Sequence, residues 1–157
     1  MRNTSLCYIE KDGAYLMLHR TKKENDENGG RWIGVGGGFE EGESPEECAA
    51  REIMEETGLA VADLSLRGIV TFVSDEWGTE YMYLFTARYD GGDVITCDEG
   101  DLEWVAKEKI PSLNLWEGDR IFLKLLAEDS PFFSLKLTYR GDELTGEIGR
   151  ASCRERV

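Results

Sequence analysis

The sequence is poor in the ligands that hold transition metals. Histidine occurs once, at His19, and none of the cysteines, Cys7, Cys48, Cys97 and Cys153, stands in a C-x-x-C pair. Because a zinc site needs several nitrogen and sulfur ligands close together, this class of site is disfavoured. We expect the cysteines to be free thiols in a reducing cytoplasm, although their even number also allows two disulfides.

Basic residues and long apolar runs are scarce as well. Lys and Arg number 18 against 32 Asp and Glu, which gives a net charge of -14 at pH 7. A field of this sign repels polymeric nucleic acid and anionic membranes, and no apolar run approaches the roughly 20 residues of a membrane span. We expect neither as a partner. A nucleotide could be held only if divalent cations neutralised its site, and the sequence specifies no oligomeric state.

Two parts of the chain differ in character. Residues 1–146 have the length of one ordinary domain and contain the periodic apolar segments. Residues 147–157, EIGRASCRERV, show no period and no apolar face, and they are basic on an acidic chain. We therefore predict a single domain over residues 1–146, followed by a tail that is non-native or disordered.

The order of the periodic segments predicts an α/β fold in which a mixed sheet lies between helices. A hairpin is expected around the Asp-Gly pair at residues 12–13. The glycine-dense run at 31–39 leads into a turn where the backbone could approach a ligand closely. The predicted helices are 45–57 and 116–128, and the predicted strands are 5–10, 14–20, 64–73, 80–89, 102–106 and 132–140.

The first of these helices has clear boundary signals. Ser44 is a suitable N-cap, Pro45 suits the first helical position, and Glu47 completes a capping box with Ser44. Gly58 stands where a C′ glycine would end the helix. The sequence therefore predicts a helix that begins at Pro45 and ends just before Gly58.

This helix carries an unusual concentration of negative charge. In REIMEETG, Glu52, Glu55 and Glu56 lie at spacings that place them on one helix face, where like charges repel. The ordinary interpretation is a solvated acidic face. The alternative is a site for a hard cation such as Mg²⁺, which prefers oxygen ligands, and an ion pair between Glu43 and Arg51 could lock the preceding loop to the helix.

The spacing also resembles a known family motif. Gly37, Glu43 and the run Arg51-Glu52-Ile53-Met54-Glu55-Glu56-Thr57-Gly58-Leu59 match the Nudix box, G-x5-E-x7-R-E-U-x-E-E-x-G-U, at every constrained position. The resemblance implies a Nudix hydrolase with an α/β/α sandwich fold. Such enzymes cleave a nucleoside diphosphate linked to another group, with Mg²⁺ or, as a substitute, Mn²⁺.

The resemblance also assigns roles by position. The carboxylates of Glu52, Glu55 and Glu56 would bind the metal together with the backbone carbonyl of Gly36. Arg51 and Glu43 would form the supporting pair. Glu52 and Glu56 stay open as alternatives for the general base. Backbone at Gly37 and Gly38 would contact the substrate.

A wider likeness extends over most of residues 4–140. GGRWIGVGGGFEEGES, CDEGDLEWV, LWEGDRIFLKLL and PFFSLKLTYRGDEL are similar to MutT-type 8-oxo-dGTP diphosphatases. This implies hydrolysis of 8-oxo-dGTP to the monophosphate and pyrophosphate, which sanitises the nucleotide pool. Glu99 would be a further metal ligand, Trp116 and Asp119 would bind the base, Met82 would line its pocket and Arg20 would touch phosphate. The alternative for Glu99 is an ordinary acid in a turn. For Trp116 and Met82 it is packing in the core, and for Arg20 it is a solvated position.

Two positions depart from that likeness. Gly38 stands where a lysine is expected, and Ile33 stands where the mammalian enzymes have an asparagine that contacts the base. Neither change touches the metal machinery. Alternative functions are therefore a Nudix hydrolase of another substrate (a nucleotide sugar, a dinucleoside polyphosphate or ADP-ribose) and a catalytically silent nucleotide sensor.

Overall fold

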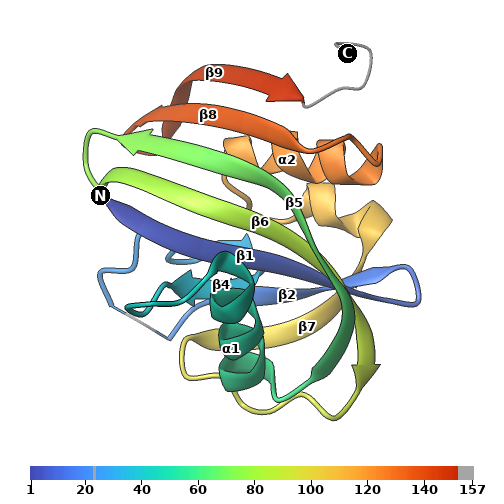
Figure 1. The fold of residues 1–157 in the computed structure, drawn as a ribbon. Coiled ribbons are helices and arrows are strands. Elements are labelled where there is room, and N and C mark those ends of the chain that lie inside the picture. The colour runs from blue at the N-terminus through green and yellow to red at the C-terminus, as the bar shows by residue number, and fades with distance from the viewer. Residues whose placement is uncertain (23, 152–157) are drawn as a thin grey trace.

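The computed structural model describes residues 1–22 and 24–151 (Figure 1). Two α-helices and one short 3-10 helix, η1, accompany a sheet. In chain order the elements are β1 (Arg2–Lys11), β2 (Ala14–Arg20), β3 (Trp32–Ile33), β4 (Val35–Gly38), α1 (Pro45–Thr57), β5 (Ala60–Ser74), β6 (Gly78–Gly91), β7 (Gly100–Ala106), η1 (Lys107–Ser112), α2 (Glu117–Ala127), β8 (Phe133–Arg140) and β9 (Glu143–Ala151).

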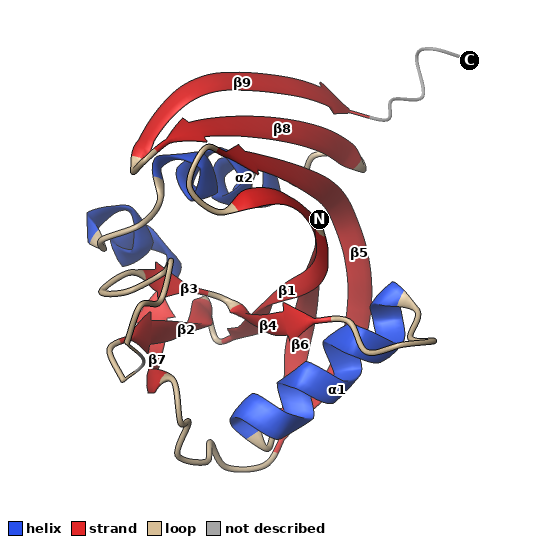
Figure 2. Ribbon diagram, turned by 90° about the vertical axis from the view of Figure 1, so that its left-hand side faces the viewer, coloured by secondary structure: helices blue, strands red, loops and turns tan. Residues whose placement is uncertain are grey.

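The sheet is mixed, as the sequence predicts. Its strand order is β3-β2-β1-β6-β5-β8-β9, while β4 pairs with β1 and β7 pairs with β2. The β1–β6 and β5–β8 pairs are parallel, and the other pairs are antiparallel. Figure 2 shows that the sheet is strongly bent, so that β8 and β9 arch over α2.

Each face of the sheet is covered by one helix. Along β1, Leu6 and Tyr8 belong to the core that includes Phe122 and Leu126 of α2. The alternate residues, Cys7 and Ile9, belong to the core under α1. Because successive side chains of a strand point to opposite faces, these two cores lie on the two sides of the sheet. The predicted α/β/α sandwich is confirmed, with α1 and α2 on opposite sides in Figures 1 and 2.

The local signals in the sequence form the structures that they predict. Asp12 and Gly13 adopt positive φ angles of 49° and 76° in the β1–β2 hairpin, which a two-residue type I′ turn requires. Ser44 and Glu47 form both halves of the capping box at the start of α1. Gly58 ends the helix in the left-handed region at φ 71°.

Three strands of the structure were not predicted. The glycine-rich run contains two of them, β3 and β4, and Gly36 of β4 lies opposite Leu6 of β1. A Cβ at Gly36 would collide with the carbonyl oxygen of Ser5. The other strand is β9, which pairs with β8 as far as Ala151. The alternative that the tail is disordered is therefore wrong for residues 147–151, while 152–157 lie outside the described residues. That the tail is non-native stays a prediction.

The cysteines and helices bear on two further expectations. Cys7, Cys48 and Cys97 are buried free thiols, and Cys153 lies outside the described residues. Within residues 1–22 and 24–151, no helix has the length and apolar character needed to cross a membrane. The cytoplasmic location stays a prediction.

Candidate active site

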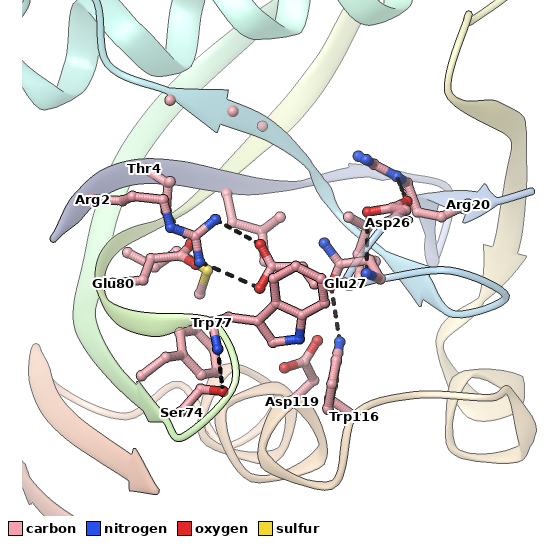
Figure 3. A pocket seen from close by; sticks show the side chains of 18 of the residues that line it. Arg2, Thr4, Arg20, Asp26, Glu27, Ser74, Trp77, Glu80, Trp116 and Asp119 are labelled. Atoms are coloured by element: carbon pink, nitrogen blue, oxygen red, sulfur yellow. Dashed lines mark hydrogen bonds and ion pairs between the residues drawn. The ribbon is translucent and has the colours of Figure 1, made fainter. Parts of the chain in front are cut away.

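A cavity of about 500 Å³ connects the glycine-rich strand β4 with the start of α2 (Figure 3). Several predicted site residues line it, and they come from strands β2, β4 and β6, from helices α1 and α2, and from loops. These residues are Arg20, Gly36, Gly37, Gly38, Glu52, Met82, Glu99, Trp116 and Asp119. Glu43, Arg51, Glu55 and Glu56 stand behind this lining, on and before α1.

Arg51 ties the loop before α1 to the helix. Its Nε lies 2.6 Å from Glu43 Oε2, and its Nη2 lies 3.0 Å from Glu43 Oε1, so the pair is bidentate. Nη2 also donates to the carbonyl of Gly38 at 2.9 Å. These bonds hold β4 and the loop at a fixed distance from the helix, and the predicted ion pair is present.

The three clustered glutamates differ in their surroundings. Arg51 Nη1 donates to Glu52 Oε1 at 2.9 Å and to Glu55 Oε2 at 3.1 Å. The Glu55 side chain is 57% exposed. Glu56 Oε1 accepts from the backbone N–H of Gly36 at 2.9 Å, whereas Glu56 Oε2 is buried and receives no donor among the described residues. The cluster therefore contains one carboxylate oxygen that is ready for a cation.

Burial and mutual repulsion perturb these acids. Loss of water raises the pKa of Glu56 to about 9, with further contributions from the negative charges of Glu99 and Glu52. Burial also raises the pKa of Glu52, against the opposing effect of Arg51. Burial and neighbouring negative charge both disfavour the ionised form of a carboxyl group, which raises its pKa.

The backbone of β4 approaches the acidic helix closely. A Cβ at Gly37 would lie 2.6 Å from the carboxyl carbon of Glu52, so only glycine leaves room for that carboxylate. At Gly38 a Cβ would meet nothing within 4 Å. The lysine expected at Gly38 would therefore fit, and its absence removes a positive charge without a steric reason.

The far end of the cavity is formed by α2 and its neighbours. The indole Nε1–H of Trp116 donates to Asn28 Oδ1 at 2.8 Å. Asp119 is only 3% exposed. Its burial, followed by the negative charge of Glu80, raises the pKa of Asp119 to about 8. Met82 is buried beside them in the same lining.

Arg20 is not a solvated residue. It is buried, and its Nε lies 2.7 Å from Asp26 Oδ2 while its Nη1 lies 2.8 Å from Glu99 Oε2. Arg2 and Arg20 are the two basic side chains of the described lining, and both are paired with carboxylates. The lining has an excess of acids, namely Asp26, Glu27, Glu52, Glu80, Glu99 and Asp119.

The NUDIX domain family matches residues 1–126, a stretch that includes α1, β4 and the cavity residues from Arg2 to Asp119. The chain belongs to the NUDIX domain family. The prediction of a Nudix hydrolase, made from the spacing of the motif residues, is confirmed, and the family supports a pyrophosphohydrolase.

Individual Nudix proteins resemble the chain over most of its length. The uncharacterized Nudix hydrolase YvcI of Bacillus subtilis (strain 168) is 28% identical over 144 residues, which are 88% of this chain and 87% of that protein. The oxidized purine nucleoside triphosphate hydrolase of Mus musculus is 34% identical over 105 residues, 66% and 67% of the two chains. The crystal structure of a MutT protein from Bacillus halodurans matches with a TM-score of 0.84, at 26% identity, and covers 95% of this chain and 97% of that chain.

Nudix hydrolases generally use a divalent metal, and the residues present fit one. The donors are carboxylate and carbonyl oxygens, which suit Mg²⁺, and the unpaired Glu56 Oε2 lies among them. Within the described residues, however, no three acidic, histidine or cysteine side chains already form a cage for a metal ion. The guanidinium of Arg51 holds Glu52 and Glu55 instead.

Sequence reasoning missed several residues of this Nudix cavity. Trp77, at the β5–β6 turn, is 40% exposed and lines the cavity. Glu80 and Arg2 line it as well, and Asn28 fixes Trp116. The alternation of β6 could have identified Glu80, because it stands two residues before Met82 and hence on the same face of the strand.

Proposed function

We propose that this Nudix hydrolase converts 8-oxo-dGTP to the monophosphate and pyrophosphate, and so removes an oxidised nucleotide from the pool. The observation that carries the proposal is the continuity of the cavity. The same lining includes Glu52 and Gly37 at one end and the buried Asp119 at the other. The mouse relative, named an oxidized purine nucleoside triphosphate hydrolase, supports this choice of substrate.

The phosphate end would hold Mg²⁺, with Mn²⁺ as a substitute. The ligands would be Glu52, Glu55, Glu56 and Glu99, with the carbonyl of Gly36. When bound, such cations screen the phosphates, polarise a phosphoryl oxygen and lower the pKa of bound water. The excess of acids in the lining supports this assignment, because both basic side chains of the described lining, Arg2 and Arg20, are already paired with carboxylates.

The protein itself contributes position and proton transfer. Arg51 and Glu43 hold β4 against α1, and Gly37 leaves room for the Glu52 carboxylate at the edge of the cavity. We assign the general base to Glu52 rather than Glu56. The reason is that the Glu52 side chain lines the cavity, whereas Glu56 does not belong to the lining.

The base end would discriminate by paired polar groups. Asp119 is buried, so a base that satisfies its carboxyl group binds better than one that leaves it unpaired. An unsatisfied buried group costs about 1–3 kcal/mol, which corresponds to roughly tenfold to hundredfold discrimination. Trp116 would hold the plane of the purine, and Met82 would pack against its edge.

Product analysis tests the proposal. The protein is incubated with Mg²⁺ and, in parallel, with 8-oxo-dGTP, dGTP and ADP-ribose, and a chelator control accompanies each reaction. We expect pyrophosphate release from 8-oxo-dGTP to exceed release from dGTP by about tenfold or more, and turnover to cease in chelator. Equal hydrolysis of dGTP, preferred cleavage of ADP-ribose, or no turnover at all would contradict the proposed substrate. Glu56→Gln should lose activity on every nucleotide.

A further inference from the structure

Glu80, on β6, places a carboxylate near Asp119 in the cavity, where the sequence motif gives no reason for one. Its side chain is 16% exposed. Arg2 Nη2 donates to Glu80 Oε1 at 2.9 Å, and the Thr4 hydroxyl donates to Glu80 Oε2 at 2.6 Å. Figure 3 shows Arg2 and Thr4 on one side of Glu80, with Asp119 across the same cavity.

The need to hold Arg2 in place does not by itself explain why Glu80 lies in the cavity. Arg2 already has a carboxylate partner in Glu27, at 2.6 Å. Phe72 and Met82 line the cavity with Glu80, so its carboxylate lies in partly apolar surroundings where loss of water is unfavourable. An ionised carboxylate can accept about four hydrogen bonds, and the described contacts supply two. Acceptor capacity is therefore left for a ligand.

Glu80 and Asp119 are suited to different partners. Burial and the nearby charge of Glu80 raise the pKa of Asp119 to about 8, so at neutral pH Asp119 can both donate and accept a hydrogen bond. Burial raises the pKa of Glu80, and the hydrogen bond from Thr4 and the charge of Arg2 oppose this rise. Because both groups that contact its carboxylate are donors, Glu80 is the better partner for an N–H donor.

We propose that Glu80 is a specificity-determining residue that accepts a hydrogen bond from the N7–H group of an 8-oxopurine. This inference rests on the proposed function and adds a second point of recognition to it. Oxidation at C8 gives N7 a proton, whereas N7 of an unmodified purine is an acceptor. A carboxylate attracts the first and repels the lone pair of the second, so Glu80 both favours the oxidised base and rejects the normal one.

Four nucleotides separate the roles of the two acids. The ratio of kcat/KM for 8-oxo-dGTP to that for dGTP, and for 8-oxo-dATP to that for dATP, reports on N7. The ratio of kcat/KM for the guanine nucleotides to that for the adenine nucleotides reports on the edge of the base that does not contain N7. Glu80→Gln should lower both oxidised-to-normal ratios by about tenfold or more, because its amide can also donate to an unprotonated N7. Asp119→Asn should chiefly change the guanine-to-adenine ratio.

Binding without turnover gives an independent measurement. Dissociation constants for 8-oxo-dGMP and dGMP, measured by calorimetry in chelator, should converge in Glu80→Gln by the same factor. Glu103→Gln, which removes an exposed glutamate from β7, is the matched control and should change no ratio. If Glu80→Gln does not fold, Glu80→Asp is tested in its place. The shorter side chain keeps the negative charge but moves it away from the base, so it should also lower the oxidised-to-normal ratios.

The outcomes distinguish this inference from the proposed function. A wild-type protein that shows no preference for 8-oxo-dGTP overturns both. A wild-type preference that survives unchanged in Glu80→Gln, or in Glu80→Asp where that variant carries the test, overturns the role of Glu80 alone. A loss of both oxidised-to-normal ratios in kinetics, with a matching change in monophosphate binding, supports both.

Discussion

The guanidinium carbon of Arg31 lies 3.6 Å from the ring centroid of Trp116 and covers one face of the indole. Tyr139 meets the same ring edge-on, with 5.0 Å between centroids, and Asn28 accepts its N–H. The ring is therefore fixed before a ligand arrives. Stacking on a base can use only the face that Arg31 leaves open.

Replacing Arg31 by Gln should release Trp116 and weaken nucleotide binding. Ordering a side chain on binding costs about 0.5–1.5 kcal/mol, so we expect KM to rise roughly twofold to tenfold while kcat changes little. Steady-state kinetics with 8-oxo-dGTP provide the measurement. Arg88→Gln, which removes an exposed arginine paired with Asp63, is the control. An unchanged KM in Arg31→Gln would show that the contact does not order the ring for binding.

Ser44→Ala should destabilise the fold by about 1 kcal/mol, because the Ser44 hydroxyl accepts the N–H of Glu47 at the start of α1. The denaturant midpoint, measured by circular dichroism, reports this loss. Ser65→Ala is a suitable control, since the Ser65 hydroxyl bonds only the nearby carbonyl of Asp63 among the described contacts. Equal midpoints for the two variants would mean that the capping box contributes nothing.

Glu56→Gln should raise the melting temperature of the metal-free protein. Among the described residues no donor reaches the buried Glu56 Oε2, which lies near the charges of Glu99 and Glu52. Above pH 9, where Glu56 is ionised, a neutral amide removes this repulsion, whereas Glu55→Gln should have little effect because Glu55 is exposed and paired with Arg51. Thermal melts in chelator at a pH above 9 compare both variants with wild type. A clear fall in the melting temperature of Glu56→Gln would identify this glutamate as structural.

Helix α1 shows which features a sequence can specify by itself. The capping box, the first-turn proline and Gly58 act within a few residues of one another, and the helix begins and ends where they predict. The box glutamates lie on one helix, so their clustering follows from its period. The ion pair of Arg51 with Glu43 was predictable because the two residues are close in sequence, on either side of the start of α1.

Features that depend on distant partners were not predictable in this way. Arg2 and Glu80 are 78 residues apart, and they meet because β1 and β6 pair in parallel. Strand β9 has no apolar period, and its structure comes from the partner strand β8. Likewise, the burial of Arg20 depends on Asp26 and Glu99, which reach it from two different loops.

Asp119 should make stability depend on pH. Its pKa is about 8 in the folded protein, against about 3.9 for an unperturbed Asp. Between these values the folded state keeps the proton and the unfolded state loses it, so this contribution is full below about pH 4 and is lost as the pH rises through about 8. Asp119→Asn lacks the effect, and its stability relative to wild type should rise across this window.

Urea midpoints at pH 4.5, 6 and 8 measure that difference. Comparing the two proteins at each pH cancels the titration of other groups that do not contact Asp119. A difference that is constant with pH would show that Asp119 ionises normally in the folded state.

Removing residues 147–157 should destabilise the protein, because strand β9 extends into this segment. Residues 147–151 pair with 133–137 of β8, where Phe133, Leu135 and Leu137 are buried. Truncation after Gly146 would leave that edge unpaired, and each lost ladder bond is worth about 0.5–1.5 kcal/mol net.

The appropriate reference is the chain truncated after Ala151, because both proteins then lack 152–157 and differ only in the strand. We expect a lower denaturant midpoint and concentration-dependent association in the shorter protein, because an exposed strand edge recruits other chains. Equal midpoints would show that β8 is stable without its partner, and the domain boundary at residue 146 would then stand.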